Sequence, residues 1–222
     1  MDDVTYYEDP RAVLCHFNPN HDPRTGRFAS RALAASIYNK ASKRVKKIES
    51  DVVSAAKETT AKMYGLDHKQ KTLESITRKI ETDSHEKGIS LREAADDIKD
   101  AVRFTTVSSD KDFVENYLTF KDELFKKGYK ELRCKNYWEL YNEGKAKHKQ
   151  VTSVFGDDTG YRFEVQFQTP SSIDAKEKKT KVYEEARKEG VSEKRKQGLI
   201  REMERLAETV TDPSGIEKIK NH

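Results

Sequence analysis

One short segment of the chain combines the alternation of a strand with side chains that can do chemistry. Residues 163–168 alternate between apolar side chains and a polar set made of Glu164, Gln166 and Gln168. Because successive side chains of a strand point to opposite faces, the polar set shares one face. A carboxylate among amides is either ordinary solvent-facing polarity or a ligand for Mg²⁺, which prefers oxygen donors. Three further polar segments favour the ligand.

The first of them is a basic run in the first half of the chain, which contains Lys69, Lys71, Ser75, Arg78 and Lys79. On a helix, Lys71, Ser75 and Lys79 would share one face, because they are spaced at i, i+4 and i+8. Two ammonium groups and a hydroxyl on one stripe can bind successive phosphates of a nucleotide. The alternative is an ordinary solvated helix face.

The second is acidic, with Asp97 and Asp100 shortly before a predicted strand that carries Arg103. An acid before a strand and an arginine on it can hold a metal ion and a phosphate. Together with Glu164, either aspartate would supply two carboxylates from neighbouring strands, a common way to hold Mg²⁺ against substrate phosphates. The alternative is a charged helix end.

The third is an aromatic and lysine-rich stretch over residues 135–148 that contains Tyr137, Trp138 and Tyr141. Interleaved aromatic rings and lysines suit base stacking with phosphate contacts. Alternatively, the stretch is a loop whose aromatic side chains anchor it to the core. His148, at its end, can act as a general base or a phosphate ligand, or simply be exposed.

In chain order, these segments resemble the synthetase domain of the RelA/SpoT family over about residues 45–188. The family shows a basic residue, x, Lys, three residues, Ser-Ile, two residues, Lys, and then an Asp ahead of an Arg-bearing strand. It ends on a strand that reads Glu-aliphatic-Gln-aliphatic-Arg-Thr. The matching positions here are Lys69, Lys71, Ser75, Ile76 and Lys79, then Asp97 or Asp100 before Arg103, then residues 164–169.

The resemblance implies an enzyme, a pyrophosphokinase that transfers pyrophosphate from ATP to the 3′-hydroxyl of GDP or GTP with Mg²⁺ as cofactor. It implies the following roles: ATP binding for Lys69, Lys71, Ser75, Arg78 and Lys79; metal binding for Asp97 or Asp100 and Glu164; catalysis for Glu164, Asp100 and Arg103; acceptor binding for Tyr137, Tyr141, His148 and Gln166. In-line phosphoryl transfer needs such cations around the phosphates.

The sequence departs from the family in the part that would hold the acceptor. No Gly-Tyr pair matches the family's Gly-Tyr-x-Ser-x-His stretch, although His148 can match its histidine, and Tyr141 or Tyr137 its base-stacking tyrosine. Gln168 stands where the family has arginine. The acceptor therefore stays open between a guanine nucleotide and the 3′ end of a tRNA, with a fold that has lost synthesis as a third possibility. The only His-Asp pair, His21-Asp22, lies in a turn-rich segment, so we expect synthesis without hydrolysis.

Composition and pattern predict an α+β fold with a mixed sheet of about four to five strands flanked by helices, similar to the nucleotidyltransferases. Charged residues make up 37% of the chain against 34% hydrophobic, which predicts a small core with long solvated helices. We expect an extended arm over residues 1–30, one domain over residues 31–211 and a disordered tail over residues 212–222. Within the domain, we expect the C-terminal helix over residues 192–211 to pack on the core or to mediate a homo-oligomer.

The partners and the compartment are expectations of the same kind. Two cysteines without metal-site spacing, Cys15 and Cys134, predict reduced thiols in a cytoplasmic protein. No apolar run approaches the length of a membrane span, so we expect no membrane segment. Residues 16–28 are similar to N-terminal arms of phage structural proteins, so residues 1–30 are predicted to bind a phage head protein. The enzyme would then act as a phage-borne toxin or as a modulator of host metabolism. The alternatives are a phage structural protein and a nucleotide- or RNA-binding module without catalysis.

Overall fold

The computed structural model describes residues 27–186 and 192–222, which divide into two compact units. The first unit comprises the described residues up to Val45 together with Gln70–Ala101, and the second comprises Lys46–Lys69 together with Val102–His222. Most of the predicted arm, including Cys15 and the His21-Asp22 pair, lies outside the described residues. Residues 27–30 were expected in the arm, but they form the start of helix α2 (Arg27–Lys57). Ser30 is fully buried there, and its hydroxyl donates to the Glu81 carboxylate at 2.6 Å.

The first unit contains two further helices, α3 (Leu73–Lys87) and α4 (Leu91–Asp96). Thr72 caps α3, since its hydroxyl accepts from the backbone N–H of Ser75. A capping box starts α4: the Ser90 hydroxyl accepts from the Glu93 N–H, and the Glu93 carboxylate accepts from the Ser90 N–H. These side chains satisfy backbone donors that a helix start leaves free, so both helices begin at defined residues.

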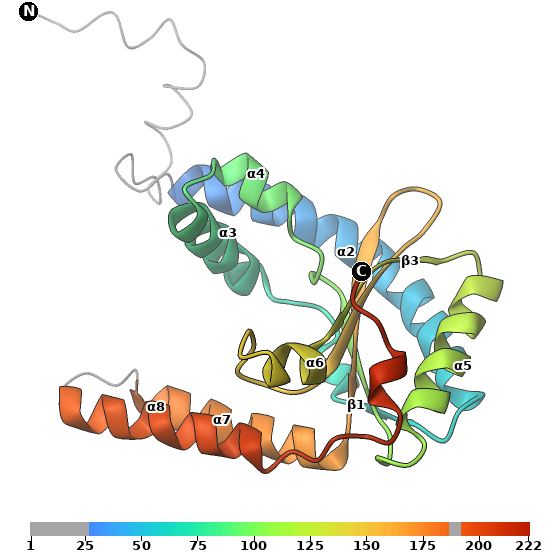
Figure 1. The fold of residues 1–222 in the computed structure, drawn as a ribbon. Helices are drawn as coiled ribbons and strands as arrows, with labels where there is room; N and C mark the ends of the chain where they lie inside the picture. Colours follow the sequence, from blue (N-terminus) through green and yellow to red (C-terminus); the bar gives the residue numbers. More distant parts are fainter. Residues whose placement is uncertain (1–26, 187–191) are drawn as a thin grey trace, which may run out of the picture. The chain divides into compact units, whose positions relative to one another are not determined.

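The second unit holds the sheet and the helices that surround it (Figure 1). After the end of α2, its elements are β1 (Lys62–Tyr64), η2 (Leu66–His68), β2 (Arg103–Val107), α5 (Phe113–Lys126), β3 (Lys130–Asn136), α6 (Tyr137–Asn142), β4 (Val151–Gly156), β5 (Arg162–Gln168), α7 (Pro170–Ala186), α8 (Glu193–Glu208) and η3 (Ile216–Lys218). The sequence pattern missed β1 and α6. Both are short, so neither shows enough of a period to be read.

The sheet is mixed, which confirms the predicted fold class. Its five strands run in the order β1-β2-β5-β4-β3. β5 is the centre, pairing in parallel with β2 and antiparallel with β4. A strand in this position has both edges occupied, so its backbone is fixed on both sides.

The apolar face of β5 forms an aromatic core. Phe163 meets Phe104, Tyr129 and Phe155 at ring-centroid distances of 5.2 to 6.4 Å. Further along the strand, Phe167 meets two rings of α5 edge to face. Such contacts add to the burial of the rings themselves. The core therefore fixes which face of β5 its polar side chains occupy.

The C-terminal segment 212–222, expected to be disordered, docks on β3 instead. His222 and Cys134 exchange two backbone hydrogen bonds of 3.1 Å, and the Asn136 amide donates to the carbonyls of Ile216 and Ile219 at 3.0 Å. The outer edge of β3 has free backbone groups to offer, which a sequence pattern does not reveal. No helix in the described part of the chain is long and apolar enough to cross a membrane.

Candidate functional site

The polar face of β5 is buried and forms one hydrogen-bonded row. Glu164, Gln166 and Gln168 are 9%, 6% and 1% exposed. The Gln166 amide donates to Glu164 Oε1 at 2.9 Å, and the Gln168 amide donates to Gln166 Oε1 at 3.4 Å. Ser172, at the start of α7, donates to the Gln168 side chain at 3.4 Å. The row holds each amide in one orientation and leaves a carboxylate at its end.

Two arginines flank Glu164 on the same face of the sheet. Arg103 of β2 is its direct partner in the register, and Arg133 of β3 is the partner of Val154, which pairs with Glu164 from the other side. Residues opposite one another in a sheet point to the same face. Arg133 Nε is buried without a hydrogen-bond partner. Arg103 and Arg133 thus place a positive charge on each side of Glu164 on this face of the sheet.

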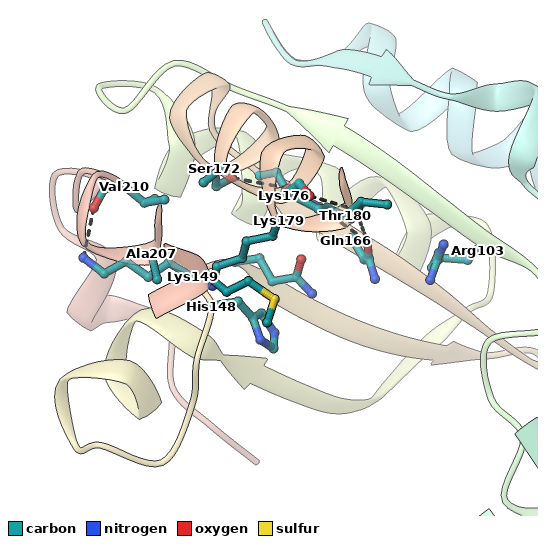
Figure 2. Close-up of a pocket in the computed structure, with 14 residues that line it drawn as sticks. Arg103, His148, Lys149, Gln166, Ser172, Lys176, Lys179, Thr180, Ala207 and Val210 are labelled. Carbon is teal, nitrogen blue, oxygen red and sulfur yellow. Dashed lines mark hydrogen bonds between the residues drawn. The ribbon is translucent and has the colours of Figure 1, made fainter. Parts of the chain in front are cut away.

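A cavity of about 380 Å³ opens beside this row (Figure 2). Its volume lies in the range of small-molecule sites. β5, α7, α8 and the segment before β4 all contribute to its walls. The lining residues are Arg103, His148, Lys149, Gln150, Gln166, Gln168, Ser172, Ala175, Lys176, Lys179, Thr180, Met203, Ala207 and Val210. Glu164 is not one of them and adjoins the cavity through its hydrogen bond to Gln166.

His148 and Lys176 have lowered pKa values for the same reason. Desolvation by the surrounding protein, with the positive charges of Lys179 and Lys176, lowers the pKa of His148 to about 4. Desolvation and the charge of Arg103 lower the pKa of Lys176 to about 8. Both side chains also keep part of their surface in contact with solvent at the open side of the cavity. At neutral pH, His148 is therefore a neutral hydrogen-bonding group, and Lys176 is a cation that a ligand can reach.

The aromatic stretch separates into one candidate and two structural side chains. The ring of Tyr137 lies against His148 with centroids 4.3 Å apart. Tyr141 does not line the cavity; its ring lies 4.9 Å from the Lys149 ammonium. Trp138 is fully buried, contacts Phe113 and donates its indole N–H to the Thr211 carbonyl at 3.0 Å. The anchoring alternative therefore holds for Trp138, and base stacking by it is wrong.

The basic run differs from its prediction at its start. Lys71 lies ahead of α3, because the Thr72 cap starts the helix at Leu73, so only Ser75 and Lys79 share a helix face. The Lys71 ammonium instead pairs with Asp100 Oδ2 at 3.3 Å. Arg78 is exposed, and Lys79 lies 3.9 Å from a carboxylate of its own helix. In the second unit, Lys69 pairs with Glu49 at 2.8 Å.

The two aspartates considered as metal ligands differ sharply. Asp97 is half exposed and pairs with Lys99 at 2.7 Å and Lys87 at 3.2 Å; their hydrogen bonds lower its pKa. Asp100 keeps one buried oxygen, Oδ1, without a hydrogen-bond partner. Mg²⁺ keeps several waters and needs only one or two protein carboxylates beside substrate phosphates, so Asp100 fits such an ion and Asp97 does not. No group of three or more metal-binding side chains occurs among the described residues.

Within each unit, the structure thus brings together part of what the sequence predicted. In the second unit, Arg103, Gln166 and His148 line one cavity, with Glu164 adjoining it. In the first unit, Lys71 and Asp100 are partners. Sequence reasoning missed Arg133 and the lysines of α7. The alternation of residues 131–135 could have indicated Arg133, whereas nothing in the pattern of α7 separates cavity-lining lysines from solvated ones.

Comparison with known proteins gives structural neighbours only. No family model and no curated protein matches the chain. The small alarmone synthetase 1 of Bacillus subtilis, solved with its product pppGpp, is 17% identical, with a TM-score of 0.49 over 77% of this chain and 88% of that one. The type VI effector Tas1, solved with its immunity protein, is 16% identical, with a TM-score of 0.46 over 83% and 96%. A GTP pyrophosphokinase family protein of Streptococcus pneumoniae is 13% identical, with a TM-score of 0.44 over 79% and 84%. The chain is thus similar in structure to alarmone synthetases and pyrophosphokinases.

Proposed function

We propose that the chain transfers a pyrophosphoryl group from ATP to the 3′-hydroxyl of a nucleotide bound in the cavity of the second unit. The observation that carries the proposal is the buried row from Glu164 to Gln168 beside a cavity lined by cations. A buried, oriented carboxylate next to a site for a polyanion is what a hydroxyl acceptor requires, because a base must face the hydroxyl.

In the proposed step, Glu164 accepts the proton of the acceptor hydroxyl. The hydroxyl oxygen bonds to the β-phosphorus of ATP, the bond from that phosphorus to the α,β-bridging oxygen breaks, and AMP leaves. Arg103 offsets negative charge that develops on the phosphoryl oxygens. Tyr137 and neutral His148 would hold the acceptor, with Gln166 fixed between Glu164 and Lys176.

Four of the five ATP-binding residues that the resemblance implies lie in the first unit. Lys71, Ser75 and Lys79 lie before and within the first turns of α3, where positive charge and free helix N–H groups favour phosphate. Asp100 would hold Mg²⁺, as its unpartnered oxygen suggests. When bound, that ion would neutralise charge on the β and γ phosphates.

Transfer of label from ATP tests this function. Protein with Mg²⁺ and γ-labelled ATP is offered GDP, GTP or bulk tRNA in separate reactions. We expect label on an acceptor and release of AMP, and we expect Glu164→Gln to lower the rate by about a hundredfold or more, as for loss of a general base. Glu202→Gln, on the exposed side of α8, is the matched control and should retain the rate.

A binding module without catalysis is the second candidate. Gln168 is neutral where the family motif has arginine, and it is held by neighbouring polar side chains inside the protein. This site would then bind a nucleotide without turning it over. Nucleotide binding with no transfer to any acceptor, and with the same affinity in Glu164→Gln, would favour the module over the enzyme.

A further inference from the structure

The short helix α6 contacts the wall of the cavity through its first residue, Tyr137. The Tyr137 ring lies against that of His148, and its backbone N–H donates to the Gln150 carbonyl at 2.8 Å. His148 and Gln150 both line the cavity, and Figure 2 shows the His148 ring there. A shift of α6 would therefore change this part of the wall.

The start of α6 depends on one buried side chain, that of Asn136. Asn136 is 1% exposed, and its Oδ1 accepts from the backbone N–H groups of Trp138 at 3.1 Å and Glu139 at 3.4 Å. Asparagine is favoured at this position because its oxygen satisfies donors that a helix start leaves free. With only six residues, α6 is too short to be stable by itself in water. Contacts with the rest of the second unit must therefore hold it in place.

The amide nitrogen of the same side chain binds the end of the chain. Asn136 Nδ2 donates to the carbonyls of Ile216 and Ile219, both at 3.0 Å and 80 and 83 positions away. The backbone N–H of Asn136 donates to Asn221 Oδ1 at 2.7 Å. An asparagine side chain can accept two hydrogen bonds and donate two, so all four of its bonds are made. Half of them serve α6, and half serve the end of the chain.

Two further contacts join α6 to residues 211–221, which we call the C-terminal strap. The Trp138 indole N–H donates to the Thr211 carbonyl at 3.0 Å, and the Asn221 amide donates to the Glu139 carboxylate. Figure 1 shows the end of the chain beside β3 and α6. The strap lies beyond the part of the chain that carries the family resemblance, so the resemblance gives it no role.

We propose that the C-terminal strap positions α6, and through Tyr137 the His148 side of the cavity, so that binding of the acceptor depends on the strap. Asn136 is the positioning residue that joins strap and helix. The inference rests on the proposed function, which places the acceptor in this cavity. A wall that is already ordered costs less free energy on binding than one that the ligand must order. Release of the strap would therefore weaken binding of the acceptor.

Hydrogen exchange followed by mass spectrometry tests the positioning without any ligand. Asn136→Ser keeps an oxygen that can cap α6 but loses both donors to the strap. Asn221→Ala, at an exposed position, removes the strap's side-chain contacts with Asn136 and Glu139. In both variants, we expect the amides of residues 137–150 to exchange about tenfold or more faster, because local opening becomes easier. The amides of β5 should exchange at the wild-type rate.

Kinetics of label transfer test the consequence for the acceptor. In both variants, the KM for the acceptor should rise about fivefold or more, whereas kcat and the KM for ATP should stay within about twofold of the wild type. The matched control is Glu217→Gln, an exposed position of the same strap, which should keep both exchange and KM. Thermal unfolding above the assay temperature would show that each variant is folded.

Three results would overturn the inference. The first is wild-type exchange of residues 137–150 in both variants. The second is an increase of the same size in β5, which would indicate a general loss of stability. The third is an equal rise in the KM values for the acceptor and for ATP, because a positioning role at this cavity concerns the acceptor alone.

The outcomes also separate the strap from the proposed reaction. If no label is transferred, the pyrophosphokinase is refuted, and calorimetry with GDP and with ADP replaces the kinetics. A loss of affinity of about fivefold or more in both variants would then leave the strap's role standing, whereas wild-type affinity, or no binding of either nucleotide, would overturn it. Label transfer with wild-type KM values in both variants would leave the enzyme standing and refute the strap's role.

Discussion

Lys149 is predicted to hold the end of α8 against the rest of the second unit. Its ammonium donates to the Val210 carbonyl at 2.9 Å and pairs with Asp212 at 2.8 Å, and it lies 4.9 Å from the Tyr141 ring. The side chain is 9% exposed. Val210 lines the cavity, so the same contacts position part of its wall.

The cost of Lys149→Met follows from these contacts. A hydrogen bond from a charged donor contributes about 1.5–3 kcal/mol. The ion pair adds at most about 1 kcal/mol, because Asp212 is half exposed, and the ring contact adds about 0.5–1 kcal/mol. Methionine keeps the length and recovers about 1 kcal/mol or more by removing the desolvated charge. We therefore expect a net loss of about 2 kcal/mol in the free energy of unfolding.

Urea unfolding measures this loss. Trp138 is the only tryptophan, is fully buried and lies in the same unit, so its fluorescence follows the unfolding of the region concerned. The matched control is Lys145→Met, because Lys145 is 68% exposed and its ion pair should contribute less than about 1 kcal/mol. If Lys149→Met unfolds within about 0.5 kcal/mol of the wild type, the contacts of Lys149 do not hold the end of α8 in place.

The remaining predictions concern charge in the site. Because the pKa of Lys176 is about 8, its side chain is mostly protonated and positively charged below that pH and mostly neutral above it. The affinity for ADP should fall by up to about tenfold between about pH 7 and pH 9, measured by calorimetry, while His148, with a pKa of about 4, stays neutral throughout. An affinity that is flat over this range would show that Lys176 does not contact the phosphates. Asp100→Asn should raise the Mg²⁺ concentration needed for half-maximal label transfer by about tenfold, and Asp97→Asn should leave it unchanged. Equal effects of the two variants would show that the choice of Asp100 is wrong.

Local sequence determined those features whose physical cause lies within a few residues. The alternation of residues 163–168 separates the apolar from the polar side of β5, because side chains of a strand alternate. The capping box at Ser90 starts α4 through hydrogen bonds within three residues. Gly128 follows α5 with φ of 89°, a conformation in which glycine is favoured. The mixed sheet follows from the order of such elements.

Only the tertiary structure decided what surrounds each of them. The polar face of β5 is buried because α7 and the segment before β4 fold back over it, and the alternation of β5 alone does not show that either will do so. Trp138 became a core residue through Phe113 and Thr211, which lie 25 and 73 positions away. The tail is ordered because β3 had an open edge.

The site shows the same division. Residue types and spacing selected Glu164, Arg103 and His148, because chemistry depends on functional groups that the sequence states directly. They could not select Lys176 and Lys179 from the other lysines of α7, or Asp100 over Asp97. Those choices depend on which ammonium lacks a carboxylate partner and which carboxylate oxygen lacks a donor. Several side chains near in sequence could serve as such partners, and only the geometry of the folded chain decides which of them pair.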